Sequence, residues 1–337
     1  MTTIQMQSLG KTGQWGNQVF QYAFIRTYAK RHGIRYEVPS WAGQSFFGLD
    51  DPPISRRLQD RREQYGPSRH EERFGNPIPP SGQEYHDKNF IGWAQYHTSW
   101  HSPDKPFLQE LFTATPSLTS YHDPLVDKLR QIGDTILSIH IRRGDSGRLI
   151  YFFVPIVWYL QWLESNWSRF KNPVLFLATE TLDYKRWFSR YNVITADDLG
   201  VSFQGTPHDK YDYPYDIGQH RARQLTFFPD WYILQHSDIV IGSESTFSAS
   251  AAWTSRVNRE YWRPRLSLQG FEQCDPWNMD VSPREHLDDF PGIPGTQLDS
   301  NPSFPEYWKG FKTTYPSVPE TDEMIQAWID THQRSPK

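Results

Sequence analysis

The sequence predicts an α/β protein made of two facing Rossmann-like domains with a cleft between them. Two observations support this fold class. The first stretch of the chain has the pattern of a strand, a Gly-rich loop, a helix and a second strand. From Thr135 onward, apolar strands alternate with helical stretches, which is typical of a parallel sheet built from βαβ units. We place the boundary between Leu118 and Asp134, so the expected domains are residues 1–130 and 131–337.

The composition limits which binding partners and which cellular compartment we expect for this protein. The formal net charge is -4 at pH 7, so we expect no nucleic-acid partner. The single cysteine, Cys274, excludes an internal disulfide and a cysteine-based zinc site. No apolar run approaches the roughly 18 residues of a membrane span, and Met1–Gln7 lacks the basic and apolar regions of a signal peptide. We therefore expect a cytoplasmic protein, or a soluble domain that lacks its membrane anchor.

The N-terminal pattern begins with a short strand around Ile4. A Gly-rich loop follows at Gly10–Gln18, then a helix that starts at Val19 and ends before Gly33, and a second strand at Ile34–Val38. A loop of this kind lets backbone N–H groups approach an anion at the N-terminus of a helix. A plain tight turn explains two glycines three residues apart equally well, so both interpretations stay open.

Residues 39–116 carry a weaker pattern. Charges of both signs fill Arg56–Glu72, which we interpret as a solvated helix or loop. An apolar and aromatic segment follows at Phe90–Tyr96, and Leu118–Ile132 has helical spacing. Gly133 ends that helix and precedes the second domain.

The second half alternates strands and helices regularly, which is the order that predicts a parallel sheet. We expect strands at Thr135–Ile141, Val174–Thr179, Asn192–Thr195 and Asp238–Ile241. We expect helices at Val157–Phe170, Leu182–Arg190, Arg221–His236 with an interruption at Pro229, Thr246–Thr254 and Ile325–Thr331.

A polar cluster marks the end of the strand Thr135–Ile141. His140 lies near its last residue, and Arg142, Arg143 and Asp145 follow it. Charged side chains are seldom buried without partners, and ligands of open α/β sheets lie at the carboxyl ends of the strands. The planar fork of an arginine matches pairs of phosphate oxygens. The pattern therefore predicts a phosphate-binding strand end.

A second polar turn follows a later apolar strand and leads into a helix of small residues. It holds Ser243, Glu244, Ser245 and Thr246. Either Ser245 or Thr246 suits the N-cap of that helix. Capping takes one oxygen, which leaves other hydroxyls for a phosphate at the positive end of the helix. With Arg142, this turn is predicted to hold two phosphates without a metal.

Two further acidic features have open interpretations. Glu180 lies just past the strand Val174–Thr179, where a carboxylate can accept two hydrogen bonds from the edge of a guanine ring. Glu180 equally suits the first turn of a following helix. The carboxylates of Asp212–Asp216 are interleaved with proline and tyrosine, which indicates an exposed loop. We therefore expect no metal site.

Three short segments resemble a known enzyme family. Gly13–Ala23, His140–Asp145 and Ser243–Ser248 resemble the signature segments of the α-1,2-fucosyltransferases. The His-x-Arg-Arg element is shared with the wider group of α-1,6- and protein O-fucosyltransferases. The resemblance implies a GT-B fold, GDP-β-L-fucose as the donor, inversion to an α-L-fucoside, and no metal or other cofactor. The implied partners are GDP-fucose and a glycan acceptor.

The resemblance implies a galactoside α-1,2-fucosyltransferase that transfers L-fucose to O2 of a terminal β-galactoside. Two alternatives stay open: an α-1,6- or protein O-fucosyltransferase with the same donor site, and a non-catalytic nucleotide-sugar- or glycan-binding protein. Four departures from the α-1,2 pattern leave the donor chemistry intact and the acceptor and linkage less defined. They are Gln14–Trp15, Glu180–Thr181, Glu244 and Ala249–Ser250.

Carried over residue by residue, the resemblance places Arg142 at the β-phosphate of the donor, with His140 beside it. Asp145 and Glu244 are candidates for the base that deprotonates the acceptor, and Asp145 equally suits holding Arg142 in place. Arg143 either binds the donor or pairs with a structural acid. The expected catalytic residues are Arg142, His140 and Asp145, and the expected donor-binding residues are Gly13, Gly16, Asn17, Arg143, Glu180, Ser243, Glu244, Ser245, Thr246 and Phe247.

Overall fold

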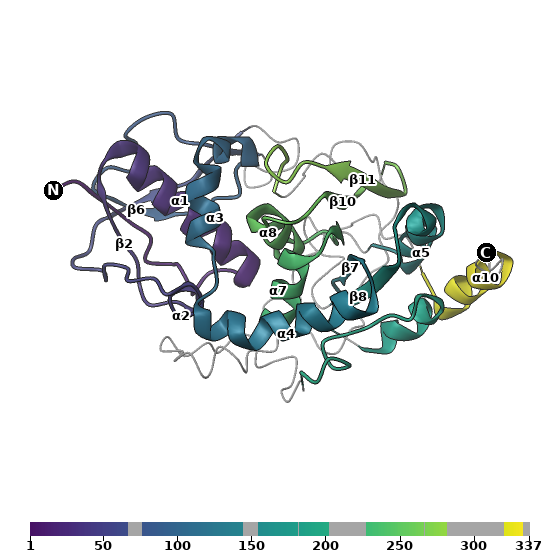
Figure 1. Cartoon of the computed structure of the whole chain (residues 1–337). Coiled ribbons are helices and arrows are strands. Elements are labelled where there is room, and N and C mark those ends of the chain that lie inside the picture. Colours follow the sequence, from purple (N-terminus) through teal and green to yellow (C-terminus); the bar gives the residue numbers. More distant parts are fainter. Residues whose placement is uncertain are drawn as a thin grey trace.

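The computed structural model shows an α/β protein with two largely parallel sheets, one in each half of the chain (Figure 1). This confirms the predicted fold class. The residues that the structure describes are 1–66, 76–143, 154–180, 182–201, 227–265, 267–281 and 320–332.

The first sheet has four parallel strands in the order β2-β1-β6-β3. Its strands and the nearby two-stranded hairpin β4-β5 are β1 (Thr3–Gln5), β2 (Arg35–Glu37), β3 (Gln59–Arg62), β4 (Gln64–Tyr65), β5 (Pro77–Ile78) and β6 (Lys88–Ile91). The prediction of a helix or loop in the charged stretch was wrong where β3 lies. β3 is an edge strand with all four side chains exposed, so its charges stay in water and no apolar alternation reveals it.

The helices of the first half include one with a corrected start. They are α1 (Trp15–His32), α2 (Ala42–Phe47), the 3-10 turns η2 (Thr98–Trp100) and η3 (Ser102–Asp104), α3 (Lys105–Leu111) and α4 (Pro116–Ile132). Helix α1 begins at Trp15, four residues before the predicted Val19, so Gly16 and Asn17 are helical. Trp15 is buried against the ring of Trp231 at a centroid distance of 5.5 Å, and this tertiary contact favours the earlier start.

The second sheet has the order β11-β10-β9-β7-β8, and only the β10-β11 pair is antiparallel. Its strands are β7 (Thr135–Ile141), β8 (Pro173–Thr179), β9 (Ile239–Ile241), β10 (Glu260–Arg265) and β11 (Gly270–Cys274). The strands at β7, β8 and β9 were predicted. The predicted strand Asn192–Thr195 is reduced to a single bridge between Ile194 and Phe176. β10 and β11 were not predicted, because charged residues and Pro264 interrupt their pattern.

The helices of the second half largely follow the prediction. They are α5 (Ile156–Asn166), the 3-10 segments η4 (Trp167–Arg169) and η5 (Leu182–Tyr191), α7 (Phe228–His236), α8 (Thr246–Thr254) and α10 (Asp322–His332). Pro229 does not interrupt a helix but lies in the first turn of α7, where a missing N–H costs no bond. The predicted helical residues 221–226 lie outside the described residues.

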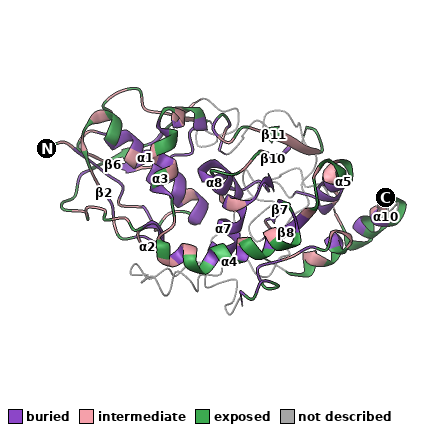
Figure 2. Ribbon diagram, in the orientation of Figure 1, coloured by how far each residue is buried: buried purple, intermediate pink, exposed green. Residues whose placement is uncertain are grey.

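One apolar core joins the two halves. Helix α1 follows the first strand in sequence but packs on α8 of the second half. Helices α7 and α8 are almost completely buried, as Figure 2 shows. Phe20 of α1 stacks on Trp253 of α8 at a centroid distance of 4.9 Å. This packing brings the N-terminus of α1 to the second sheet.

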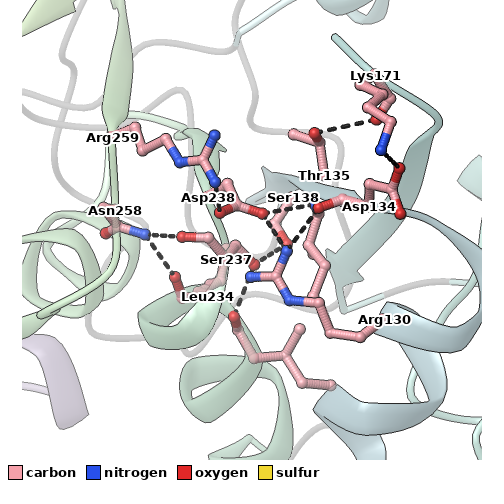
Figure 3. Close-up of polar contacts among 12 residues, drawn as sticks. Arg130, Asp134, Thr135, Ser138, Lys171, Leu234, Ser237, Asp238, Asn258 and Arg259 are labelled. Atoms are coloured by element: carbon pink, nitrogen blue, oxygen red, sulfur yellow. Dashed lines mark hydrogen bonds and ion pairs between the residues drawn. The ribbon is translucent and has the colours of Figure 1, made fainter.

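A charged cluster fixes the amino ends of the central strands (Figure 3). Asp238, just before β9, accepts hydrogen bonds from Arg130 of α4 and from the backbone N–H of Ile136 in β7, the latter at 2.9 Å. Arg259 approaches the other carboxylate oxygen at 3.2 Å. These contacts join α4, β7 and the residues just before β9 and β10 at the amino ends of the strands, the opposite end of the sheet from the polar turns.

Candidate functional site

The two predicted polar turns meet at the carboxyl edge of the second sheet. β7 and β9 are parallel neighbours, with Ile139 opposite Ile241. The residues that follow each strand therefore emerge side by side. Arg142 donates from Nη1 to the backbone oxygen of Glu244 at 3.3 Å. The predicted proximity of Arg142 and the serine-rich turn is observed.

His140 is held inside this edge by two neighbours. Its Nδ1 and the hydroxyl of Ser243 share a hydrogen bond of 3.0 Å, and both residues are buried. The ring of Phe247 packs on the imidazole at a centroid distance of 5.1 Å. The hydrogen bond and the ring contact together fix the orientation of the imidazole.

The start of α8 settles which hydroxyl caps the helix. Ser245 is the N-cap and accepts a hydrogen bond from the N–H of Phe247 at 3.2 Å. Thr246 donates instead to Oδ1 of Asn17 at 3.0 Å. Asn17 belongs to α1, so this bond links the first turns of two helices that are far apart in sequence.

Gly16 allows the two helices to meet. A Cβ atom built on Gly16 would lie 2.4 Å from the carbonyl carbon of Thr246 and 2.6 Å from the nitrogen of Phe247, closer than real side chains approach backbone. Gly13, just before α1, has a left-handed φ of 78° that also favours glycine. The glycine at position 16 therefore allows the first turn of α1 to approach the first turn of α8 closely.

The result is a concentration of positive potential. Each helix leaves its first N–H groups without partners inside the helix, and its dipole places partial positive charge there. The first turns of α1 and α8 touch, and the guanidinium of Arg142 is bonded to the residue just before the α8 cap. This arrangement is suited to an anion with more than one phosphate.

The side chain of Arg143 contacts different neighbours from that of Arg142. It is buried, its Nη2 lies 3.7 Å from Oε2 of Glu320, and its guanidinium lies 5.1 Å from the ring centroid of Tyr184. The same glutamate accepts from the N–H of Val157 at 3.0 Å. These contacts favour the alternative in which Arg143 pairs with a structural acid.

The two acids first considered for the site lie in different surroundings. The carboxylate of Glu244 is buried and faces Arg263 at 3.7 Å, which turns it away from solvent. Glu180 is exposed at the end of β8. Asp145, a third candidate, lies outside the described residues.

Asp230 was missed by the sequence reasoning. It lies in the first turn of α7, is 8% exposed, and its Oδ1 has no hydrogen-bond partner among the described residues. Burial raises the pKa of this carboxyl well above its usual value. Phe227, the residue before α7, lies 6.5 Å from Phe247 of α8 between ring centroids, so the N-terminal end of α7 approaches the start of α8. The signal of Asp230 in the sequence is a lone acid in an apolar helix.

The described ranges contain neither a metal-binding cluster nor a helix that could span a membrane. No group of three or more His, Cys, Asp or Glu side chains there has the arrangement of a metal site. No helix in those ranges combines the length and apolar character needed to cross a membrane. The carboxylates of Asp212–Asp216 lie outside the described residues.

Sequence comparison and structure comparison give different results. No protein-family model and no curated protein matches the chain by sequence. Among solved structures, the α-1,6-fucosyltransferase NodZ from Bradyrhizobium, crystallised with GDP, matches with a TM-score of 0.50 and 13% identity over 81% of this chain and 97% of NodZ. A variant of Arabidopsis thaliana FUT1 in complex with GDP matches with a TM-score of 0.50 and 11% identity over 84% of this chain and 76% of that one.

The fold is that of the GT-B-type fucosyltransferases. The wider fucosyltransferase group named by the sequence resemblance therefore agrees with the structure at the level of fold. A shared fold does not establish a shared function, so the function of this chain has to be argued from the residues of its own site.

Proposed function

We propose that this protein is a glycosyltransferase that transfers L-fucose from GDP-β-L-fucose to a hydroxyl of a glycan. The observation that carries the proposal is the contact between the first turns of α1 and α8 beside Arg142. Two helix N-termini and a guanidinium supply the positive potential that a nucleoside diphosphate requires. NodZ and FUT1, which share the fold, were both crystallised with GDP.

The proposed chemistry follows from the charge that develops during transfer. The bond between C1 of fucose and the β-phosphate oxygen breaks, and negative charge accumulates on the phosphate while the sugar gains oxocarbenium character. Arg142 stabilises that charge, and His140, held by Ser243, lies beside it. The acceptor hydroxyl attacks C1 from the opposite face and passes its proton to a base, for which Asp145 is the remaining candidate because Glu244 is buried against Arg263. The products are the α-linked glycan and GDP, without a metal. Loss of one preorganised donor of this kind costs about 2.7–4 kcal/mol of transition-state stabilisation.

We further propose that Asp230, in preference to Glu180, recognises the guanine base. A carboxylate accepts two hydrogen bonds from the N1–H and N2–H groups of guanine, and an unpaired buried acid is suited to receive them. Asp230 is buried and lacks a partner at Oδ1 among the described residues, whereas Glu180 is exposed to water. An exposed acid gains less from binding because it is already hydrated.

We propose that the first half of the chain binds the acceptor, most simply the terminal β-galactoside implied by the sequence resemblance. Trp93 is 38% exposed and lies against Gly13, where an added Cβ would be 2.7 Å from the indole. The buried carboxylate of Glu63 accepts from the N–H groups of Trp93 and Ala94 at 2.9 and 3.0 Å, which fixes this turn. The flat apolar face of a fixed indole suits the C–H face of a sugar ring.

The test is isothermal titration of the purified protein with GDP-fucose, GDP, UDP and GDP-mannose, all with EDTA present. We expect guanine nucleotides to bind and UDP not to bind. A preference for UDP, or a need for Mg²⁺ or Mn²⁺, contradicts the donor assignment. Transfer to a β-galactoside is then compared with transfer to a chitooligosaccharide. Transfer to the chitooligosaccharide alone replaces the α-1,2 assignment with the α-1,6 alternative, and binding without transfer or donor hydrolysis identifies a non-catalytic protein.

A further inference from the structure

A buried ion pair involves Glu244 of the polar turn Ser243–Thr246, which we call the phosphate turn. Oε1 of Glu244 is 3.7 Å from Nη2 of Arg263 on β10, and the two side chains are 3% and 4% exposed. Glu244 stands between Ser243 and the α8 cap Ser245, both of which are in the proposed diphosphate site. The sequence thus places an acid where a negatively charged ligand is expected.

Arg263 also binds a second segment of the same polypeptide, near residue 280. Its Nη1 donates to the backbone oxygen of Asp280, and its Nη2 donates to that of Val281 at 3.2 Å. The adjacent Met279 is bonded to Thr98 of the first half in both directions, at 2.8 and 2.9 Å. One guanidinium therefore connects the phosphate turn to a segment anchored on the first half of the chain.

An unneutralised carboxylate at this point would act against ligand binding. Charges interact more strongly in the protein interior than in water, so a buried Glu244 repels a diphosphate. The guanidinium of Arg142 is bonded to the backbone oxygen of the same residue, so the position of Glu244 also affects the position of Arg142. The guanidinium of Arg263, 3.7 Å from the Glu244 carboxylate, offsets this charge.

We propose that Arg263 is a positioning residue of the diphosphate site, which neutralises Glu244 and holds the turn so that Arg142 faces the ligand. This inference rests on the proposed function, because it concerns the same donor site. It assigns to Arg263 no contact with the donor. It explains how an acid is tolerated inside a turn that binds an anion.

The test measures the affinity for GDP and for inorganic pyrophosphate by titration calorimetry in three variants. We expect Arg263→Met to weaken the binding of both ligands by about tenfold or more, because it removes the buried positive charge that faces Glu244. Glu244→Gln is expected to bind both at least as tightly as the wild type, since it leaves a positive charge instead. The double variant is expected to return to within about threefold of the wild type, because a buried pair can be replaced as a unit.

Opposite signs of the two single variants distinguish this role from a purely structural one. A pair that only stabilises the fold lowers the thermal stability and the affinity in both single variants, and that result overturns the inference. If Arg263→Met does not fold, Glu244→Gln decides alone: an affinity reduced about tenfold overturns the inference, and an equal or higher affinity supports it.

Arg265→Met is the matched control. Arg265 lies two residues further along β10, is 22% exposed, and pairs with Glu272 at 2.6 Å. Arg265→Met removes the same charge from the same strand, and we expect this variant to bind both ligands within about twofold of the wild type, because a partly exposed charge is screened more strongly than a buried one. A wild-type protein that binds neither ligand overturns the proposed function itself. Wild-type binding with unchanged affinity in Arg263→Met overturns only the role of Arg263.

Discussion

Replacing Asp230 with asparagine tests the recognition of the base. Asparagine keeps the shape and one acceptor oxygen but presents N–H groups where the second carboxylate oxygen lies. One hydrogen bond to guanine is then lost, and a bond to a charged group contributes about 1.5–3 kcal/mol. Asp230→Asn is therefore expected to weaken GDP binding by about 10- to 150-fold, as measured by titration calorimetry at pH 7.

The pH dependence gives an independent check with a definite sign. Burial raises the pKa of Asp230 in the free protein, so this acid is protonated there at pH values where it is ionised in the unfolded chain. Its contribution to stability is therefore present at low pH and is lost as pH rises through the raised pKa. Guanine favours the ionised form, so GDP affinity falls as pH falls through the same pKa. Both pH dependences are expected to vanish in Asp230→Asn.

Glu180→Gln is the matched control, because it makes the same change at the competing acid. Exposed at the end of β8, Glu180 is expected to contribute little, so this variant keeps the GDP affinity of the wild type. Loss of guanine selectivity in Glu180→Gln, together with unchanged binding in Asp230→Asn, would refute the reasoning from burial.

Three further changes test the site and its support. Arg142→Ala is expected to lower kcat/KM for fucosyl transfer by about 10²–10³ with an unchanged melting temperature; near-normal turnover contradicts its role. Gly16→Ala is expected to push apart the first turns of α1 and α8 and to lower GDP affinity, because its Cβ meets the backbone of Thr246 at 2.4 Å. Gly33→Ala, with open space around its Cβ, is the control and should cost only about 1–2 kcal/mol of stability for its left-handed backbone. Asp238→Asn is expected to lower the free energy of unfolding in urea by about 1.5–3 kcal/mol, because the buried Asp238 carboxylate accepts hydrogen bonds from Arg130 and from the N–H of Ile136; an unchanged midpoint contradicts this.

Local patterns predicted the elements that carry the site. β7 has the predicted bounds, Thr135–Ile141, because its seven buried positions appear in the sequence as a run dominated by isoleucine and leucine. Helix α8 likewise has its predicted bounds, Thr246–Thr254, and its cap is one of the two residues expected. The charged residues that follow β7 stand out because they interrupt an otherwise apolar strand end.

Elements without a local pattern were missed. The edge strand β3 keeps its charges in water and depends on its neighbour β6 for its conformation. Helix α1 starts early because Trp15 finds a buried aromatic site supplied partly by α7. The contact between Trp15 and Trp231 joins residues more than two hundred positions apart, and no local window of sequence contains both partners.

The sequence by itself determined the α/β class, the cluster of charged residues at the Arg142 strand end, and the hydroxyl-rich turn at Ser245. These follow from residue type and order, which local backbone preferences translate directly into strands, caps and turns. Only the tertiary structure decided that Gly16 lets α1 meet α8, that Arg263 faces Glu244 at 3.7 Å, and that Asp230 is buried without a partner at Oδ1 among the described residues. Burial and ion pairing are properties of a residue's surroundings, and those surroundings exist only once the chain has packed.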